Sequence, residues 1–242
     1  MTNLETPPAS TLTWMHDGTE RLTGLLATVD DAELDAPSLL PGWSRRHVLA
    51  HIEANARALG RLLHWARTGE ETPMYPSREA RDAEIEQDAG LSPRELRALV
   101  HDSAAELSSD LQTFPDERWA SKIEARGRAI PASTIPWMRA VELWVHMADL
   151  DCGVTFADFP ADLVDALLAD VAETLTERGQ DPALVLRPED REREWLAGAG
   201  TASAVAVTGR ASGLAAWVTG RGDSGARPVE EGTALPTLDA WR

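Results

Sequence analysis

Residues 135–151 read IPWMRAVELWVHMADLD, and this stretch decides the fold. Its apolar residues lie on most sides of a helix, which is typical of a helix at the centre of a helical bundle. Glu142 and His146 lie four residues apart in it, so their side chains share one helix face. Asp149 extends that face by one turn. A carboxylate and an imidazole among apolar neighbours are costly unless they are paired or bind a metal, so the functional site is expected here.

A third polar group is expected from an earlier helix. Residues 45–68, RRHVLAHIEANARALGRLLHWART, carry apolar residues at helical spacing, and His51 borders that apolar stripe. His51 is therefore expected to face Glu142 and His146. His47 is the alternative, one turn earlier near the start of the helix. A Glu–His hydrogen-bonded pair without a metal would fit the same pattern, and the residues alone leave both interpretations open.

The first 153 residues predict a bundle of helices joined by turn-rich segments. Helices are expected at residues 10–29, 45–68 (between the N-cap Ser44 and the stop Gly69), 78–87, 93–111 (after Ser92) and 135–151. Residues 124–134, EARGRAIPAST, are expected to form an irregular connection. Four of these helices are long, which favours a four-helix bundle.

The sequence changes character after Gly153. A helix is expected at residues 161–178, followed by strands at 183–187, 194–198 and 203–209, and by a helical stretch at 211–220. Mixed strands and helices over about 90 residues predict a small α+β domain. The expected domains are therefore residues 1–153 and residues 154–242.

Composition narrows the classes of partner. The 242 residues are 43% hydrophobic and 26% charged, as in a globular protein with a substantial core, and the net charge is −17. That charge repels phosphate backbones and anionic lipids, so neither nucleic acid nor a membrane is an expected partner. A single cysteine, no visible secretion signal and no apolar run of membrane-spanning length predict a cytoplasmic protein. No P-loop or dinucleotide fingerprint indicates a nucleotide cofactor.

Two stretches, PGWSRRHVLAHIEAN at residues 41–55 and ELWVHMADLD at residues 142–151, resemble the mycothiol-dependent maleylpyruvate isomerase family. That family belongs to the DinB/YfiT-like group of metal-binding four-helix bundles. The resemblance extends over essentially the whole chain. It implies an α+β fold in which a DinB-like four-helix bundle is followed by a small domain similar to sterol carrier proteins. The two motifs are more specific for the superfamily than for the isomerase.

The resemblance also implies the site residues. The metal ligands of the family fall on His51, Glu142 and His146. Two nitrogens and one carboxylate oxygen suit a divalent metal such as zinc, and three protein ligands leave a position open for water or substrate. Asp149 becomes a candidate for orienting His146 or a bound water, and the alternative is a solvated helix acid or a cap for a neighbouring segment.

Arginines for a dicarboxylate substrate are implied as well, because a guanidinium binds carboxylates through two parallel hydrogen bonds. The expected catalytic residues are Arg81, in the segment before the third long helix, and Arg221, from the second domain. Arg78 and Arg210 are the next choices. For Arg81 and for Arg221, a surface salt bridge is the alternative.

The implied reaction is the cis–trans isomerisation of maleylpyruvate to fumarylpyruvate in gentisate-type aromatic degradation. A thiolate that adds to the alkene carbon and later leaves would allow rotation, and a metal would activate the thiol or polarise the carbonyl. The resemblance implies that mycothiol supplies the thiol. Cys152, the single cysteine, is expected to be a buried structural residue, which is consistent with an external thiol. The expected partners are thus a dicarboxylate and a low-molecular-weight thiol. A mycothiol S-transferase and a non-catalytic, metal-stabilised binding module remain as alternatives.

Overall fold

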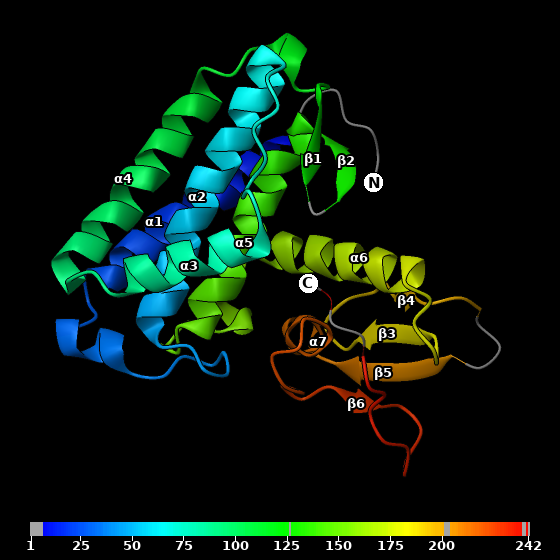
Figure 1. Ribbon diagram of the computed structural model, residues 1–242. Coiled ribbons are helices and arrows are strands. Elements are labelled where there is room, and N and C mark those ends of the chain that lie inside the picture. The colour runs from blue at the N-terminus through cyan, green and yellow to red at the C-terminus, as the bar shows by residue number, and fades with distance from the viewer. Residues whose placement is uncertain (1–6, 126, 201–203, 239–240, 242) are drawn as a thin grey trace. The chain divides into compact units, whose positions relative to one another are not determined.

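The computed structural model describes residues 7–125, 127–200, 204–238 and 241, and its chain divides into two compact units (Figure 1). The first unit is Met1–Gly153 and the second is Val154–Arg242. Each unit is described by itself below. Within the described ranges, none of the helices combines the length and the apolar character needed to cross a membrane.

The first unit is a bundle of four long helices with a fifth, shorter helix beside it (Figure 1). The long helices are α1 (Ala9–Leu26), α2 (Arg45–Thr68), α4 (Pro93–Gln112) and α5 (Ile135–Asp149), and the short one is α3 (Arg78–Ala89). Helix α5 packs against both α1 and α2, while α2 also packs against α3 and α4. Thirteen of the fifteen residues of α5 are buried, which confirms that this helix is central.

The ends of α2 and α4 lie where the sequence places them. Gly69 ends α2 with φ of 82°, a left-handed conformation that glycine adopts at no steric cost. Ser92 caps α4: its Oγ accepts from the Glu95 backbone N–H, and the Glu95 carboxylate accepts from the Ser92 N–H at 3.0 Å. Such local caps are legible in sequence because the interacting residues are only three positions apart.

Two boundaries in the first unit differ from expectation. The expected irregular connection at residues 124–134 is wrong for most of its described residues: 124–125 and 128–131 lie in the paired strands β1 (Lys122–Ala125) and β2 (Arg128–Pro131), and 132–134 form a 3-10 turn. The paired Ile123 and Ile130 are both buried, and four-residue strands carry too little periodicity to be recognised. Helix α1 also ends at Leu26 and not at residue 29. The guanidinium of Arg97 on α4 donates to Leu26 O at this end and to Val29 O at 2.6 Å.

The second unit combines two helices with a four-stranded sheet. The helices are α6 (Ala161–Glu177) and α7 (Ala211–Val218); the strands are β3 (Leu184–Pro188), β4 (Trp195–Ala197), β5 (Val205–Gly209) and β6 (Arg227–Pro228). The strand order is β4-β3-β5-β6, with β3 and β5 parallel and the other pairs antiparallel. The two-residue β6 was not expected. The expected strand at 203–209 begins at Val205, and residue 203 lies outside the described residues. The predicted α+β fold class is confirmed.

Candidate metal centre

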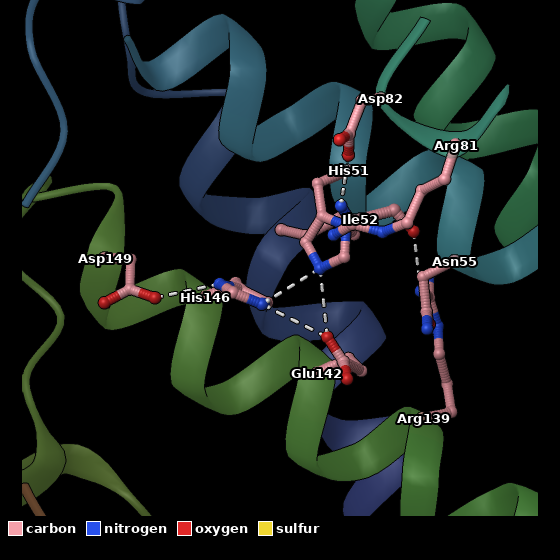
Figure 2. Close-up of polar contacts among 9 residues, drawn as sticks. All are labelled: His51, Ile52, Asn55, Arg81, Asp82, Arg139, Glu142, His146 and Asp149. Atoms are coloured by element: carbon pink, nitrogen blue, oxygen red, sulfur yellow. Dashed lines mark hydrogen bonds and ion pairs between the residues drawn. The ribbon is translucent and has the colours of Figure 1, made fainter. Parts of the chain in front are cut away.

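Helices α2 and α5 bring three side chains to one point inside the bundle (Figure 2). His51 Nε2 lies 3.1 Å from Glu142 Oε2 and 3.1 Å from His146 Nε2, and the last two atoms are also 3.1 Å apart. His51 and Glu142 are buried, and His146 is nearly so. Residues separated by more than 90 positions in sequence thus form an equilateral triangle of metal-binding atoms.

The triangle has the dimensions of one face of a coordination tetrahedron. Zinc bound at about 2.0–2.1 Å with tetrahedral angles spaces its ligand atoms about 3.3 Å apart, close to the 3.1 Å found here. Two imidazole nitrogens and a carboxylate oxygen are also the donor types that zinc prefers. The residues present therefore fit a divalent metal with three protein ligands and one open position.

The protonation of the three groups is set by their burial and by one another. Burial, with the charge of His146 next, lowers the pKa of His51 to about 4, so its imidazole is neutral near pH 7. Burial alone would raise the pKa of Glu142, but hydrogen bonds from His146 and His51 hold it well below its ordinary value. Burial alone would lower the pKa of His146, yet hydrogen bonds to Asp149 and Glu142 raise it. The carboxylate is therefore ionised, and the raised pKa of His146 favours the protonated form, whose proton a metal would displace.

Asp149 orients the outer side of His146. Its Oδ2 lies 2.8 Å from His146 Nδ1, one turn along α5, and its side chain has no exposed surface. A carboxylate at Nδ1 keeps a proton on that nitrogen, which leaves Nε2 as the atom for a metal. The alternative of a solvated helix acid is wrong, because the apolar packing of α5 extends to its last turn.

Arg81, on α3, reaches the opposite side of the triangle. Its Nη2 lies 3.1 Å from His51 Nδ1, and its Nη1 lies 2.9 Å from Asp82 Oδ1 (Figure 2). The side chain of Arg81 is 30% exposed. Arg78, three residues earlier, is almost fully exposed and lies 3.9 Å from Asp82.

A buried arginine behind the triad was not anticipated. Arg139 precedes Glu142 by one turn and is 1% exposed; its Nη1 donates to Ile52 O at 2.7 Å and to Asn55 Oδ1 at 2.9 Å (Figure 2). It thereby links α5 to α2 at the depth of His51. Burial lowers the pKa of Arg139 to about 10, so it remains a cation near Glu142. The sequence signal that could have identified Arg139 is the presence of a charged residue in the most apolar helix of the bundle, since a charge buried there needs polar partners.

Two other side chains from the sequence argument lie apart from the triad. His47 Nδ1 lies 2.7 Å from Ser44 Oγ at the start of α2, and its Nε2 lies 3.5 Å from Glu86. Cys152 is half-buried, and its thiol donates to Leu150 O at 3.4 Å. Burial raises the pKa of the Cys152 thiol, which disfavours the reactive thiolate.

The remaining arginines belong to the second unit. Arg221 follows α7, and its Nη1 donates to Thr219 O at 2.6 Å. Its role toward substrate stays a prediction. Arg210, the next choice, is largely exposed and forms a surface ion pair with Asp190 at 3.8 Å.

Comparisons with known proteins cover the whole chain. Residues 15–151 match the family model of the mycothiol maleylpyruvate isomerase N-terminal domain, and residues 158–240 match the MDMPI C-terminal domain. A crystal structure of the mycothiol-dependent maleylpyruvate isomerase is 37% identical, with a TM-score of 0.91 and full coverage of both chains. A histidine-to-alanine mutant of the mycothiol-dependent maleylpyruvate isomerase is 36% identical, with a TM-score of 0.90 and the same coverage. No match was found among curated proteins.

Proposed function

The chain belongs to the mycothiol-dependent maleylpyruvate isomerase family, and we propose that it converts maleylpyruvate to fumarylpyruvate with mycothiol as its thiol cofactor. The observation that carries the proposal is the buried triangle of His51, Glu142 and His146 within a chain that matches an isomerase of this family from end to end. A place in gentisate-type aromatic degradation is part of the same proposal.

The triad holds a divalent metal, for which zinc is our choice. The 3.1 Å spacing, the two nitrogens and the carboxylate support this assignment. A metal bound there supplies Lewis acidity, either to a thiol or to the carbonyl of the substrate. The chain itself contributes the geometry of the ligands. Asp149 holds the proton of His146 on Nδ1. The hydrogen bond from Arg139 on α5 to Ile52 O on α2 holds the two ligand-bearing helices in register.

The arginines bind the substrate in this proposal. Maleylpyruvate is a dianion, and the net charge of −17 works against its approach. Arg81 places a partly exposed guanidinium beside the triad, where it can pair with one carboxylate. Arg221 is proposed to bind the other carboxylate.

The thiol comes from outside the chain. Cys152 is the single cysteine of the sequence, and the raised pKa of its thiol keeps it protonated. Mycothiol supplies a thiolate that can add to one alkene carbon, which converts the double bond into a single bond. After rotation about that bond, the thiolate leaves and the double bond forms again. The chain therefore has to bind and orient this thiol and has no need of a nucleophile of its own.

Two alternatives use the same site differently. An S-transferase would join mycothiol to an electrophile and consume one thiol per turnover, whereas the isomerase regenerates it. A non-catalytic binding module would use the metal only to hold α2 and α5 together. A structural metal is normally surrounded by four protein ligands, and the triad offers three, which favours catalysis.

The deciding experiment measures turnovers per thiol. Zinc-loaded protein would be mixed with maleylpyruvate and sub-stoichiometric mycothiol, and fumarylpyruvate would be followed by absorbance. Many turnovers per mycothiol, lost in His51→Ala but kept in His64→Ala, support the isomerase; His64 is an exposed histidine on the same helix. Loss of one mycothiol per turnover would support the transferase. If neither fumarylpyruvate formation nor loss of mycothiol is observed, the non-catalytic binding module remains.

A further inference from the structure

Helix α3 carries Arg81 to the triad, yet it has little apolar surface with which to pack. Its twelve residues read REARDAEIEQDA, and only Ile85, Asp88 and Ala89 are buried. The burial of one large apolar side chain stabilises such a contact only modestly, and it also has to offset the ordering of the helix. Polar contacts must therefore contribute much of what holds α3 in place.

Those contacts converge on Arg57 of α2. Its Nη1 lies 2.7 Å from Glu84 Oε1, and its Nη2 lies 2.6 Å from Asp88 Oδ2, so two carboxylates of α3 share one guanidinium. From its own helix, Glu53 binds the same guanidinium at 2.6 Å and 2.7 Å. Glu53 has no exposed surface and Asp88 is 10% exposed, whereas Glu84 is 23% and Arg57 itself is 36% exposed. Solvent therefore screens the pairs with Glu53 and Asp88 less than it screens a pair of two exposed side chains.

Glu53 fixes the orientation of the Arg57 guanidinium as well as pairing with its charge. Glu53 lies four residues before Arg57 on α2 and occupies both Nε and Nη2, which fixes the plane of the fork. The remaining directions then meet Glu84 and Asp88, four residues apart on α3. A lysine has no planar fork and could not hold three carboxylates in these directions.

Arg81 lies on the same side of α3 as these two carboxylates. Positions 81, 84 and 88 follow the three- and four-residue spacing of one helix face. That face meets α2 at two places: Arg81 at His51, and Glu84 with Asp88 at Arg57. His51 and Arg57 are six residues apart on α2, so a rotation or shift of α3 at Arg57 moves Arg81 relative to the triad.

We propose that Arg57 is a positioning residue, which fixes α3 on α2 so that the guanidinium of Arg81 stays beside His51. The inference rests on the proposed function, in which Arg81 binds a carboxylate of the substrate. Another charged contact between the two helices, His47 with Glu86, is longer at 3.5 Å, and its Glu86 side chain is 69% exposed. It supplies a control rather than a second anchor.

Two variants test the proposal. Arg57→Met removes the fork, with Arg67→Met as its control, because Arg67 is an α2 arginine of nearly equal exposure that contacts Asp110 of α4. Glu84→Gln/Asp88→Asn removes only the charges on α3 and leaves the pair of Arg57 and Glu53 intact, so it avoids an uncompensated buried carboxylate. Glu86→Gln is the matched change on the same helix.

Two readouts are needed, one of them independent of turnover. Hydrogen exchange of residues 78–89 should lose protection in Arg57→Met and in Glu84→Gln/Asp88→Asn, and keep it in both controls. The ratio kcat/KM for maleylpyruvate should fall about 10- to 100-fold in the same two variants, mainly through KM, because the carboxylate partner is misplaced. Zinc affinity should stay as in the unmodified protein.

A double-variant comparison ties the effect to Arg81. Adding Glu84→Gln/Asp88→Asn to Arg81→Ala should cost little further kcat/KM, because the residue being positioned is already gone. Full additivity, or unchanged kcat/KM in Glu84→Gln/Asp88→Asn, would overturn the proposal. If the unmodified protein fails to turn over maleylpyruvate, the proposed function is wrong. In that case, loss of protection in residues 78–89 still supports the role of Arg57 in holding α3, and normal protection refutes it.

Discussion

Asp149 Oδ2 lies 2.8 Å from His146 Nδ1, in the last turn of the central helix and out of contact with solvent. This contact fixes which nitrogen of His146 faces Glu142 and His51. The triad is therefore supported by a fourth residue that does not belong to the triangle itself.

Replacing Asp149 by asparagine should weaken metal binding while preserving the bundle. The amide keeps the shape of the side chain and can still accept a hydrogen bond, but it removes the charge that raises the basicity of His146. Zinc affinity, measured by competition with a chelator, should fall about 10- to 100-fold. Asp151→Asn is the control, because Asp151 is exposed and asparagine tolerates its φ of 53°. Equal affinities in the two variants would contradict the role assigned to Asp149.

Metal binding should release a proton from His146. The pKa of His146 is raised above its ordinary value of 6.5, so at pH 6.5 more than about half of the molecules carry a proton that the metal must displace. His51, whose pKa is lowered to about 4, should contribute none at that pH. Affinity should consequently fall as the pH drops through the raised pKa of His146.

Calorimetric titration of zinc in two buffers of different ionisation enthalpy measures the number of protons released. Asp149→Asn should release fewer at pH 6.5, since the hydrogen bond to Asp149 is the largest contribution that raises the pKa of His146. Release of no proton by the unmodified protein at pH 6.5 would contradict the assignment.

Removing the thiol of Cys152 should leave turnover and its dependence on mycothiol unchanged. The raised pKa of this thiol and its contact with Leu150 O are those of a structural residue. Cys152→Ala, assayed over a range of mycothiol concentrations, should match the unmodified protein in both kcat and the mycothiol concentration at half-maximal rate. A variant that no longer turns over would show that the chain supplies the nucleophile.

Two glycines of α1 should respond in opposite directions to the same substitution. A Cβ at Gly18 would lie 2.8 Å from Trp144 Nε1 and 3.3 Å from Leu143 Cβ, whereas one at Gly24 would meet nothing within 4 Å. The Trp144 ring cannot move freely, because its Nε1 donates to Trp14 O at 2.8 Å. Gly18→Ala should therefore cost about 1–3 kcal/mol, while Gly24→Ala should stabilise by about 0.5–1 kcal/mol. Thermal unfolding of the two variants gives the comparison, and a stabilised Gly18→Ala would refute the close approach of α1 to α5.

Much of the fold was predictable because its signals are local. The ends of α2 and α4 follow from Ser44, Gly69 and Ser92, each of which acts within a few residues of the helix end that it marks. The central position of α5 follows from its composition. The hairpin of β1 and β2 was missed, because four-residue strands are stabilised by the surrounding core more than by any pattern of their own.

The sequence by itself determined the helices, the change of character after Gly153 and the shared face of Glu142 and His146, because each depends on residues a few positions apart. It also brought His51 forward as a candidate. Only the tertiary structure decided that His51 meets the pair at 3.1 Å, that Arg81 lies beside it, and that Arg57 and Arg139 tie α2 to its neighbours. Those contacts join residues 27 to 95 positions apart, and the packing of helices, which no local pattern encodes, sets their distances.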